Sequence, residues 1–272
     1  MESKLLQVPC RMKPIKSTDP SLFDPRAFQV EAPKMSPEEF PPVILFENER
    51  VLAVNKPGWL VCHPSKTGPG SSLVGAAKRY LDVEKIHLVS RLDRETSGIV
   101  VFAKDRGAAR FIQMAVEARK VEKSYLTILD GVLEAETTVD RKIVADKTSE
   151  VRVKMRALPT EADPTIRTHF QPIRTWDQLT LCRVMTDGGR KHQIRVHANH
   201  LGMPLVGDKL YGPDELYYLE FCQEGWTQNL SEKLNFHRQA LHCGEWFLEN
   251  ELGLPSITVP LPSDLESLVS SN

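Results

Sequence analysis

Residues 91 to 98 read Arg91-Leu92-Asp93-Arg94-Glu95-Thr96-Ser97-Gly98. They follow an apolar-led stretch at 86–89 and precede the strand-like apolar run 99–103. A carboxylate between two arginines is held ionised by its neighbours and can act as a nucleophile or as a base. The same residues could instead form a plain turn, in which Asp93 and Thr96 cap backbone groups and Gly98 adopts a positive φ. Taken alone, this stretch favours the turn.

The composition is that of an ordinary globular protein. The chain has 272 residues, of which 41% are hydrophobic and 26% charged, so it can bury a large core. It contains no apolar run near the roughly 20 residues of a membrane span, and its start lacks the long apolar segment of a secretory signal. We therefore expect a cytoplasmic protein without a membrane partner. Five widely spaced cysteines form neither a disulfide framework nor a metal knuckle, and we expect them to be reduced.

The formal net charge is −1, but the charges are unevenly distributed. Residues 104–125 carry six cations and three acids, whereas residues 213–235 carry five acids and one lysine. A nearly neutral total can therefore conceal a basic face that suits a nucleic acid. The commoner alternative is that both segments are simply solvated surface.

The chain divides by composition near residue 42. Residues 1–42 hold eight of the nineteen prolines and little periodicity, which predicts a proline-rich N-terminal arm with at most a short helix at 36–39. Residues 43–272 are expected to form one compact domain. Within it, the acidic and aromatic segment 213–235 is expected to be a helical insertion.

Periodicity in 43–272 predicts few helices among many strands. Apolar spacing predicts helices over 73–81, capped by Ser72, and from Asp105 to Ala118. Strands are expected at 43–46, 51–54, 59–62, 99–103, 125–129, 151–155, 166–170 and 179–185. Isolated helices among strands indicate an α+β fold with a mainly antiparallel sheet, not a βαβ repeat.

A second group of polar residues lies at 189–200. If 191–201 is a helix, Arg195 lies one turn from His192 on the same side. Arg190, Lys191 and Arg195 are then a donor cluster suited to phosphates or to a carboxylate, although Lys191 is more simply read as a solvated cation.

Three histidines in this segment raise the alternative of a zinc hydrolase. His192 and His197 are five residues apart and diverge around a helix, and no glutamate follows His192 where a general base would be needed. With His200 they make a weak ligand set, so we expect no metal. His192 could still contact a substrate.

Taken together, these motifs resemble those of the RluA-type pseudouridine synthase family. The resemblance extends in order from about residue 44 to the end of the chain. It rests on Asn55-Lys56-Pro57-Gly58, Arg91-Leu92-Asp93 with Thr96-Ser97-Gly98, Lys123-Ser124-Tyr125 with Gly131, Gly189-Arg190-Lys191-His192-Gln193-Ile194-Arg195-Val196-His197, Gly207-Asp208 with Tyr211-Gly212, and Arg238-Gln239-Ala240-Leu241-His242. Each piece alone is moderately specific, whereas the colinear set is highly specific.

The resemblance implies a mixed, mainly antiparallel sheet flanked by helices, with an RNA-binding cleft along it. It implies isomerisation of a chosen uridine in RNA without cofactor or metal. By resemblance Asp93 is the catalytic aspartate, Tyr125 packs on the target base, Arg195 pairs with the aspartate, and Arg91 fills the gap left by the extruded nucleotide. Further RNA contacts are expected at Lys56, Lys123, Arg190 and His192.

The chemistry is compatible with these roles. Breaking the glycosidic bond and rejoining the ring through C5 requires the base to leave its stack and turn inside a closed pocket. Asp93 could attack the sugar, attack the ring or remove the ribose 2′ proton, and the sequence does not choose among these. The rival outside catalysis is an RNA-binding or RNA-chaperone protein on the same fold, which would keep its activity in an Asp93→Asn variant.

Two departures bear on the target. Ser90 stands where many relatives have histidine, which affects support of the loop but leaves Asp93 in place. Residues 1–42 do not resemble the small RNA-binding domain that many relatives carry. Transfer RNA and ribosomal RNA are both compatible substrates, and the lack of that domain favours transfer RNA. A monomer is the default expectation.

Overall fold

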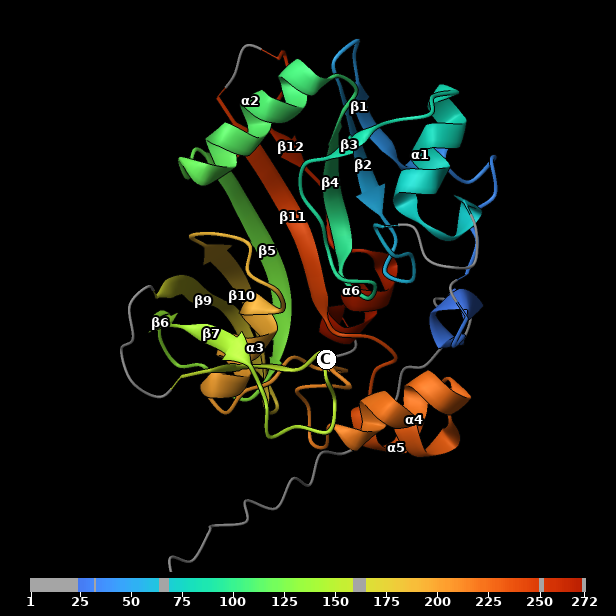
Figure 1. Cartoon of the computed structure of the whole chain (residues 1–272). Coiled ribbons are helices and arrows are strands. Elements are labelled where there is room, and N and C mark those ends of the chain that lie inside the picture. The colour runs from blue at the N-terminus through green and yellow to red at the C-terminus, as the bar shows by residue number, and fades with distance from the viewer. Residues whose placement is uncertain (1–23, 32, 64–68, 159–164, 250–251, 271–272) are drawn as a thin grey trace, which may run out of the picture.

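One long twisted sheet runs through the molecule (Figure 1). The computed structural model describes residues 24–31, 33–63, 69–158, 165–249 and 252–270. Within them ten strands form the large sheet: β1 (Ile44–Glu47), β2 (Val51–Lys56), β3 (His87–Leu88), β4 (Ser97–Ala103), β5 (Val121–Asp130), β6 (Thr137–Arg141), β9 (Ile166–Trp176), β10 (Leu179–Thr186), β11 (Leu241–Leu248) and β12 (Ile257–Thr258). The strands β7 (Ile143–Ala145) and β8 (Met155–Ala157) form a separate small sheet.

The sheet is mixed but mainly antiparallel, as the sequence predicts. Its order is β1-β2-β4-β11-β5-β10-β9-β6, with β3 beside β4 and β12 beside β11. Among the described strands the β4 and β11 pair is parallel and the other pairs are antiparallel. At that parallel contact Gly98 has φ 110°, and a Cβ there would lie 2.2 Å from the Cys243 carbonyl oxygen. Only glycine allows β11 to come this close to the end of the Asp93 loop.

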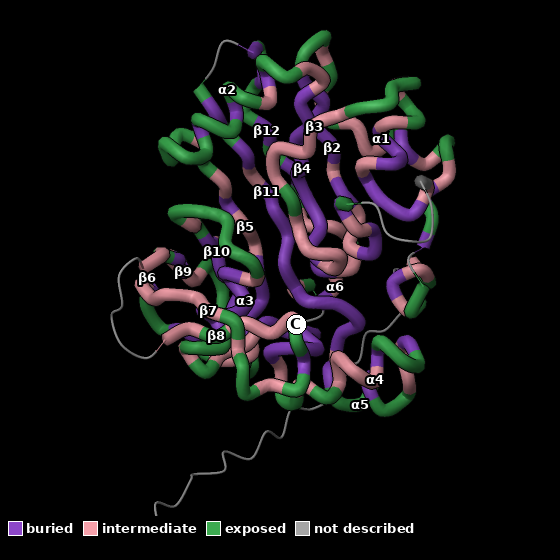
Figure 2. Tube along the Cα trace, in the orientation of Figure 1, coloured by how far each residue is buried: buried purple, intermediate pink, exposed green. Residues whose placement is uncertain are grey.

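Helices cover both faces of the sheet. They are α1 (Leu73–Leu81), α2 (Arg106–Glu117), α3 (Gln193–His200), α4 (Leu216–Glu224), α5 (Gln228–Leu234) and α6 (Ser263–Ser270), with short 3₁₀ turns at Pro25–Phe28, Pro41–Val43 and Pro69–Ser71. Alternate residues of β2 pack on α1 and on α2, so these two helices lie on opposite faces. Figure 2 shows the buried centre along β4 and β11 between the exposed outer sides of the helices.

The two helices predicted from periodicity are confirmed together with their caps. Ser72 Oγ accepts the Gly75 N–H at 3.1 Å, and an Asp105 side-chain oxygen accepts the Ala108 N–H at 2.8 Å. Each cap satisfies a backbone donor that the first helical turn leaves unpaired. Local sequence therefore determined where both helices begin.

Three predicted elements are wrong, because turns occupy their places. Residues 59–62 turn after Pro57 instead of continuing as a strand, and 37–39 form a turn. There the Glu39 carboxylate accepts the Ser36 N–H at 2.7 Å but also binds Arg26, so the capping contact forms without a helix. Residues 151–154 close a turn through the Lys154 N–H and the Val151 carbonyl, and β8 begins only at Met155. Their alternation reflected burial of Val151, not an extended backbone.

The described part of the proline-rich segment packs on the domain. Met35 and Phe40 are buried against α1. The Arg26 guanidinium lies 3.8 Å from the ring centroid of Trp59, and the Phe28 carbonyl accepts the Trp226 N–H at 3.1 Å. Residues 1–23 and 32 lie outside the described residues. The division at residue 42 stays a prediction.

Candidate active site

Asp93 lies in the loop between β3 and β4, close to the parallel contact of β4 with β11. The Thr96 N–H donates to the Asp93 carbonyl at 3.2 Å, so the loop does contain the turn that local sequence favours. The Asp93 side chain is 34% exposed and lines a cavity of about 90 Å³, hereafter the central cavity. The turn thus presents the carboxylate to a hollow.

Arg195 holds that carboxylate from α3. Its Nη1 donates to Asp93 Oδ2 at 2.9 Å, while Nε and Nη2 donate to the two oxygens of Asp208 at 2.7 and 2.8 Å. Asp208 is fully buried and also accepts the backbone N–H groups of Leu210 and Tyr211. A two-pronged pair of this kind fixes the plane of a guanidinium, so Arg195 offers one remaining edge to Asp93.

Charge keeps Asp93 ionised. Burial works to raise the pKa of Asp93, but the positive charge and hydrogen bond of Arg195 outweigh it and hold the pKa below the ordinary value. A carboxylate that stays negative while facing a cavity can act as a nucleophile or a base.

His192 sits beside the same carboxylate. The helix α3 begins at Gln193, later than predicted, and His192 stands at its N-cap position with φ 57° but without a capping side-chain hydrogen bond. Its Nε2 lies 3.9 Å from Asp93 Oδ2, and its Nδ1 lies 2.8 Å from the Tyr211 hydroxyl. That hydroxyl accepts the Met155 N–H, which leaves its own proton for His192 Nδ1. The neutral ring then carries its proton on Nε2, toward Asp93.

The pH dependence of kcat/KM for a reaction at Asp93 should show no ionisation near the ordinary pKa of histidine. Burial and the neighbouring Arg195 lower the pKa of His192 to about 4, and the pKa of Asp93 is also lowered. Neither group changes charge between about pH 5 and 7, so kcat/KM is expected to stay level there in a pH series. A break near pH 6.5 that disappears in a His192→Gln variant would contradict this assignment.

Tyr125 lines the central cavity together with Asp93. It lies on β5 opposite Cys243 of β11. Burial, together with the nearby Cys243 and Asp93, raises the pKa of Tyr125 well above its ordinary value, so its ring is neutral. A neutral aromatic face at the wall of the cavity is suited to contact a base.

The predicted RNA contacts separate into three groups. Arg91 and Arg190 are exposed and line the central cavity, as does the largely buried His192. Lys123 instead lines an adjoining hollow of about 530 Å³ at the start of β5, the β5 cavity. Lys56 is fully buried, with its ammonium donating to the carbonyls of Pro57, Leu60 and Arg94. The expected RNA contact at Lys56 is therefore wrong, because its ammonium is buried and already bound to three carbonyls, one of which, that of Arg94, belongs to the Asp93 loop.

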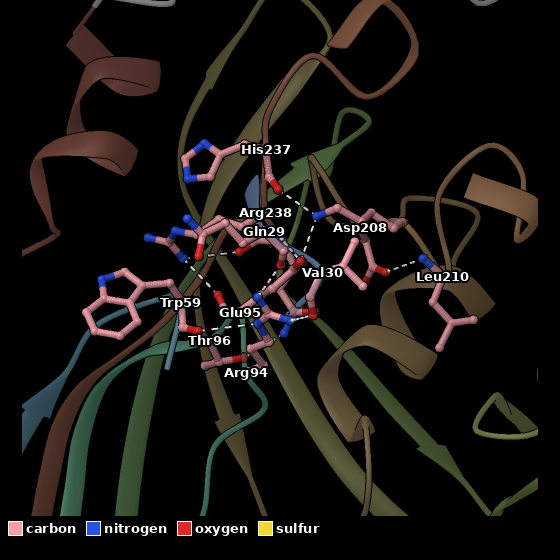
Figure 3. Close-up of polar contacts among 12 residues, drawn as sticks. Gln29, Val30, Trp59, Arg94, Glu95, Thr96, Asp208, Leu210, His237 and Arg238 are labelled. Atoms are coloured by element: carbon pink, nitrogen blue, oxygen red, sulfur yellow. Dashed lines mark hydrogen bonds and ion pairs between the residues drawn. The ribbon is translucent and has the colours of Figure 1, made fainter. Parts of the chain in front are cut away.

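Further charged residues, outside the set of predicted site residues, support this loop (Figure 3). Arg238 donates to the Glu95 carbonyl at 3.0 Å and forms a two-pronged pair with Asp264 of α6. Lys209 is buried and binds the Glu95 carboxylate at 2.7 Å. Arg94 donates to backbone carbonyls of the N-terminal segment and of Trp59. Arg238 belongs to a quoted motif, Arg94 belongs to the stretch 91–98, and Lys209 directly follows the Gly207-Asp208 pair. The contacts that these three side chains make were not visible in the sequence.

The central cavity belongs to a longer cleft. It shares Thr186, Gly188 and Gly189 with the β5 cavity. On the other side it shares Asp93, Lys191, His192 and Arg195 with a hollow of about 250 Å³ beside α4, the α4 cavity. The three cavities therefore adjoin one another, and Asp93 lines the central cavity and the α4 cavity where these two meet.

The described residues provide no ligand set for the zinc hydrolase alternative. Within the described ranges, no group of three or more His, Cys, Asp or Glu side chains is arranged to hold a metal ion. His197 Nδ1 lies 2.7 Å from the Thr168 hydroxyl, and Cys62, Cys182, Cys222 and Cys243 are free thiols. Cys10 lies outside the described residues.

None of the helices in the described part of the chain combines the length and apolar character that a membrane span requires.

The fold and the site define a class of protein in which one ionised carboxylate faces a groove bordered by arginines and an aromatic ring. A family model described as RNA pseudouridylate synthase matches residues 50–200, which include Asp93, Tyr125 and Arg195. The chain belongs to this family, and it is an isomerase that acts on RNA.

Individual relatives agree. A Xanthomonas campestris protein named ribosomal large subunit pseudouridine synthase D is 33% identical over 242 residues, which cover 87% of this chain and 71% of the relative. The Xylella fastidiosa protein of the same name is 33% identical over 241 residues, covering 86% and 70%. The solved structure of human RNA pseudouridylate synthase domain containing 4 superposes with a TM-score of 0.65 at 23% identity, covering 86% of this chain and 95% of that one. This last likeness supports the fold.

Proposed function

We propose that this pseudouridine synthase modifies a uridine in large-subunit ribosomal RNA and that Asp93 is its catalytic carboxylate. The observation that carries the catalytic part is the 2.9 Å contact of Asp93 with Arg195, itself anchored by Asp208, at the wall of the central cavity. The ribosomal substrate rests on the names of the relatives. The expectation of a transfer RNA substrate was based only on residues 1–42. It stays a prediction, and the names of the relatives do not favour it.

The remaining residues take the roles that the family resemblance implies, and their positions are compatible with these roles. The target uridine leaves its stack to reach Asp93, because the reacting carbons are inaccessible in a stacked strand. Tyr125 lies against the everted base, and Arg91 at the exposed rim occupies the space that the base leaves. Arg195 keeps Asp93 negative and oriented throughout.

A non-catalytic RNA-binding protein fits the site less well. Exposed cations such as Arg91 and Arg190 would suit a binding protein as well as an enzyme. Phosphate binding does not account for a buried arginine that is divided between a buried and a cavity-facing carboxylate. Placing a negative charge at the centre of an RNA groove weakens binding, so the arrangement is better explained by a reaction at Asp93.

Pseudouridine mapping of total RNA from cells with and without the gene tests the substrate. We expect one or a few pseudouridines of large-subunit ribosomal RNA to disappear with the gene and to return with the wild-type gene. Loss of a transfer RNA position alone would replace the proposed substrate. An unchanged map of all RNA would contradict the activity itself.

RNA binding is expected to weaken with salt through the exposed cations of the groove. Replacing Arg190 with alanine should lower the slope of log affinity against log salt by about one if it contacts one phosphate. Filter binding over a salt series measures this slope. Lys85→Ala is the matched control, because Lys85 is exposed and lines none of the three cavities. Equal slopes for the wild type and the Arg190 variant would show that Arg190 does not contact an RNA phosphate.

A further inference from the structure

The α4 cavity is a second hollow beside the reacting carboxylate. Its inner wall is the Asp93 loop, and its outer wall is α4, which contributes Tyr218, Phe221 and Cys222. Its volume of about 250 Å³ exceeds the volume of about 90 Å³ of the central cavity, with which it shares Asp93, Lys191, His192 and Arg195. The helix α4 lies outside the matched range 50–200, so the family match assigns it no role.

Charge distinguishes the two directions in which an RNA strand can leave the central cavity. The cations lining the α4 cavity are Arg94, Lys191, Arg195 and Lys209, against the acids Asp93 and Glu95. The β5 cavity has Arg119 and Lys123 against Glu122, Asp187 and Glu245. The α4 side is therefore net positive by two charges and the β5 side net negative by one, which favours a phosphate backbone on the α4 side.

The aromatic wall of the α4 cavity is suited to a base. Lys209 Nζ lies 4.5 Å from the centroid of the Phe221 ring, so a cation already covers that ring. Tyr218 is half-buried and lies near Cys222, Arg195 and Glu95. Burial and the nearby Cys222 raise the pKa of Tyr218 to about 12, so its ring is neutral. Exposed Lys191 stands at the rim shared with the central cavity.

We propose that the α4 cavity binds the base of an unpaired nucleotide next to the target uridine in the same RNA strand, with Tyr218 against the base and Lys191 toward its phosphate. The proposal rests on the proposed function, because it takes the central cavity as the place of the target. It gives α4 a part in target choice, since a paired neighbour would not enter the cavity. Stacking on an aromatic side chain tolerates any base, so the cavity selects an unpaired neighbour and not a particular sequence.

A combined protein and RNA substitution tests the stacking contact. The protein carries Asp93→Asn to prevent turnover, and the probes are synthetic stem-loops of the mapped target with an abasic residue on either side of the uridine. Tyr218→Ala is expected to weaken binding of the intact stem-loop about 5- to 100-fold. With Tyr218 present, one of the two abasic probes should bind more weakly than the intact stem-loop by a similar factor. The Tyr218→Ala protein should bind that abasic probe and the intact stem-loop equally well.

Tyr217→Ala is the matched control on the same helix, because Tyr217 packs against the small cluster with Leu230 and does not line the α4 cavity. It should bind both intact and abasic stem-loops as the parent does. Circular dichroism verifies that both alanine variants are folded. If Tyr218→Ala binds normally, or remains fully sensitive to both abasic probes, the proposed base contact is wrong.

Cys222 gives a test that needs no mapped target. It is exposed at the α4 cavity, whereas Cys62, Cys182 and Cys243 are buried, and a Cys10→Ser background removes the remaining cysteine. Transcribed large-subunit ribosomal RNA and, separately, total transfer RNA are bound to the protein, and the alkylation rate of Cys222 by N-ethylmaleimide is measured. The RNA that binds should slow alkylation about 5-fold or more.

The two proposals can fail separately. Protection of Cys222 without isomerisation of any uridine would contradict the proposed function and leave the α4 cavity as an RNA site. Isomerisation with an unchanged alkylation rate for bound RNA would overturn the α4 cavity alone.

Discussion

Replacing Asp93 with asparagine is expected to lower kcat for pseudouridine formation by at least about 10⁴-fold, on the scale seen when a reacting residue is removed. The amide has the same shape and still accepts a hydrogen bond from Arg195, whose pair with Asp208 is untouched. It lacks the negative charge that attack on the sugar, attack on the ring or removal of the 2′ proton would each require. The reaction should therefore stop while the fold and RNA affinity persist.

Release of the uridine C5 hydrogen from labelled RNA measures this loss, because rejoining the ring through C5 displaces that hydrogen. Asp177→Asn is the matched control, since Asp177 is exposed in the turn between β9 and β10. It should react at the wild-type rate. Hydrogen release by Asp93→Asn within about tenfold of wild type would mean that another group supplies the chemistry.

Local patterns were sufficient for much of the fold. The α1 and α2 helices follow from apolar spacing and from caps three residues ahead of a backbone donor, both of which act within a single turn. The strand pattern at 151–155 failed because alternate burial there arises in a turn packed on Tyr211 and Val196. Alternation records which side chains face a core, and a turn can produce it as well as a strand can.

The site was predictable to the extent that its residues follow the motifs. Asp93 and Arg195 are 102 positions apart, yet both stand in stretches that resemble the family. The motifs did not reveal that Lys56 is buried on three carbonyls or that Asp208 anchors Arg195. The segment 213–235 was expected to shape one edge of the cleft, but its sequence did not show that α4 lines a cavity together with Asp93. Burial of a charge depends on partners brought from distant segments, and local sequence does not show those partners.

Asp208→Asn is expected to lower the free energy of unfolding by about 3–5 kcal/mol, as when one partner of a buried ion pair is removed. Asparagine can still accept the N–H groups of Leu210 and Tyr211 that Asp208 holds. The loss of stability therefore arises mainly from the buried charge of Arg195, which keeps only Asp93 as a counter-charge. Activity should fall as well, since a guanidinium no longer fixed in its plane holds Asp93 less firmly.

Urea denaturation of the purified variants measures the change through the unfolding midpoint. Asp140→Asn is the control, because Asp140 pairs with Arg167 at the exposed surface, and exposed pairs contribute little to stability.

Adding Arg195→Met to Asp208→Asn removes the buried charge itself, so stability should return in part while activity does not. A difference between the recovery of stability and the recovery of activity separates the two roles of Arg195. Its buried charge causes the loss of stability when Asp208 is replaced, and its remaining N–H group holds Asp93. An Asp208→Asn protein with the midpoint of the Asp140→Asn control would show that Arg195 does not depend on Asp208.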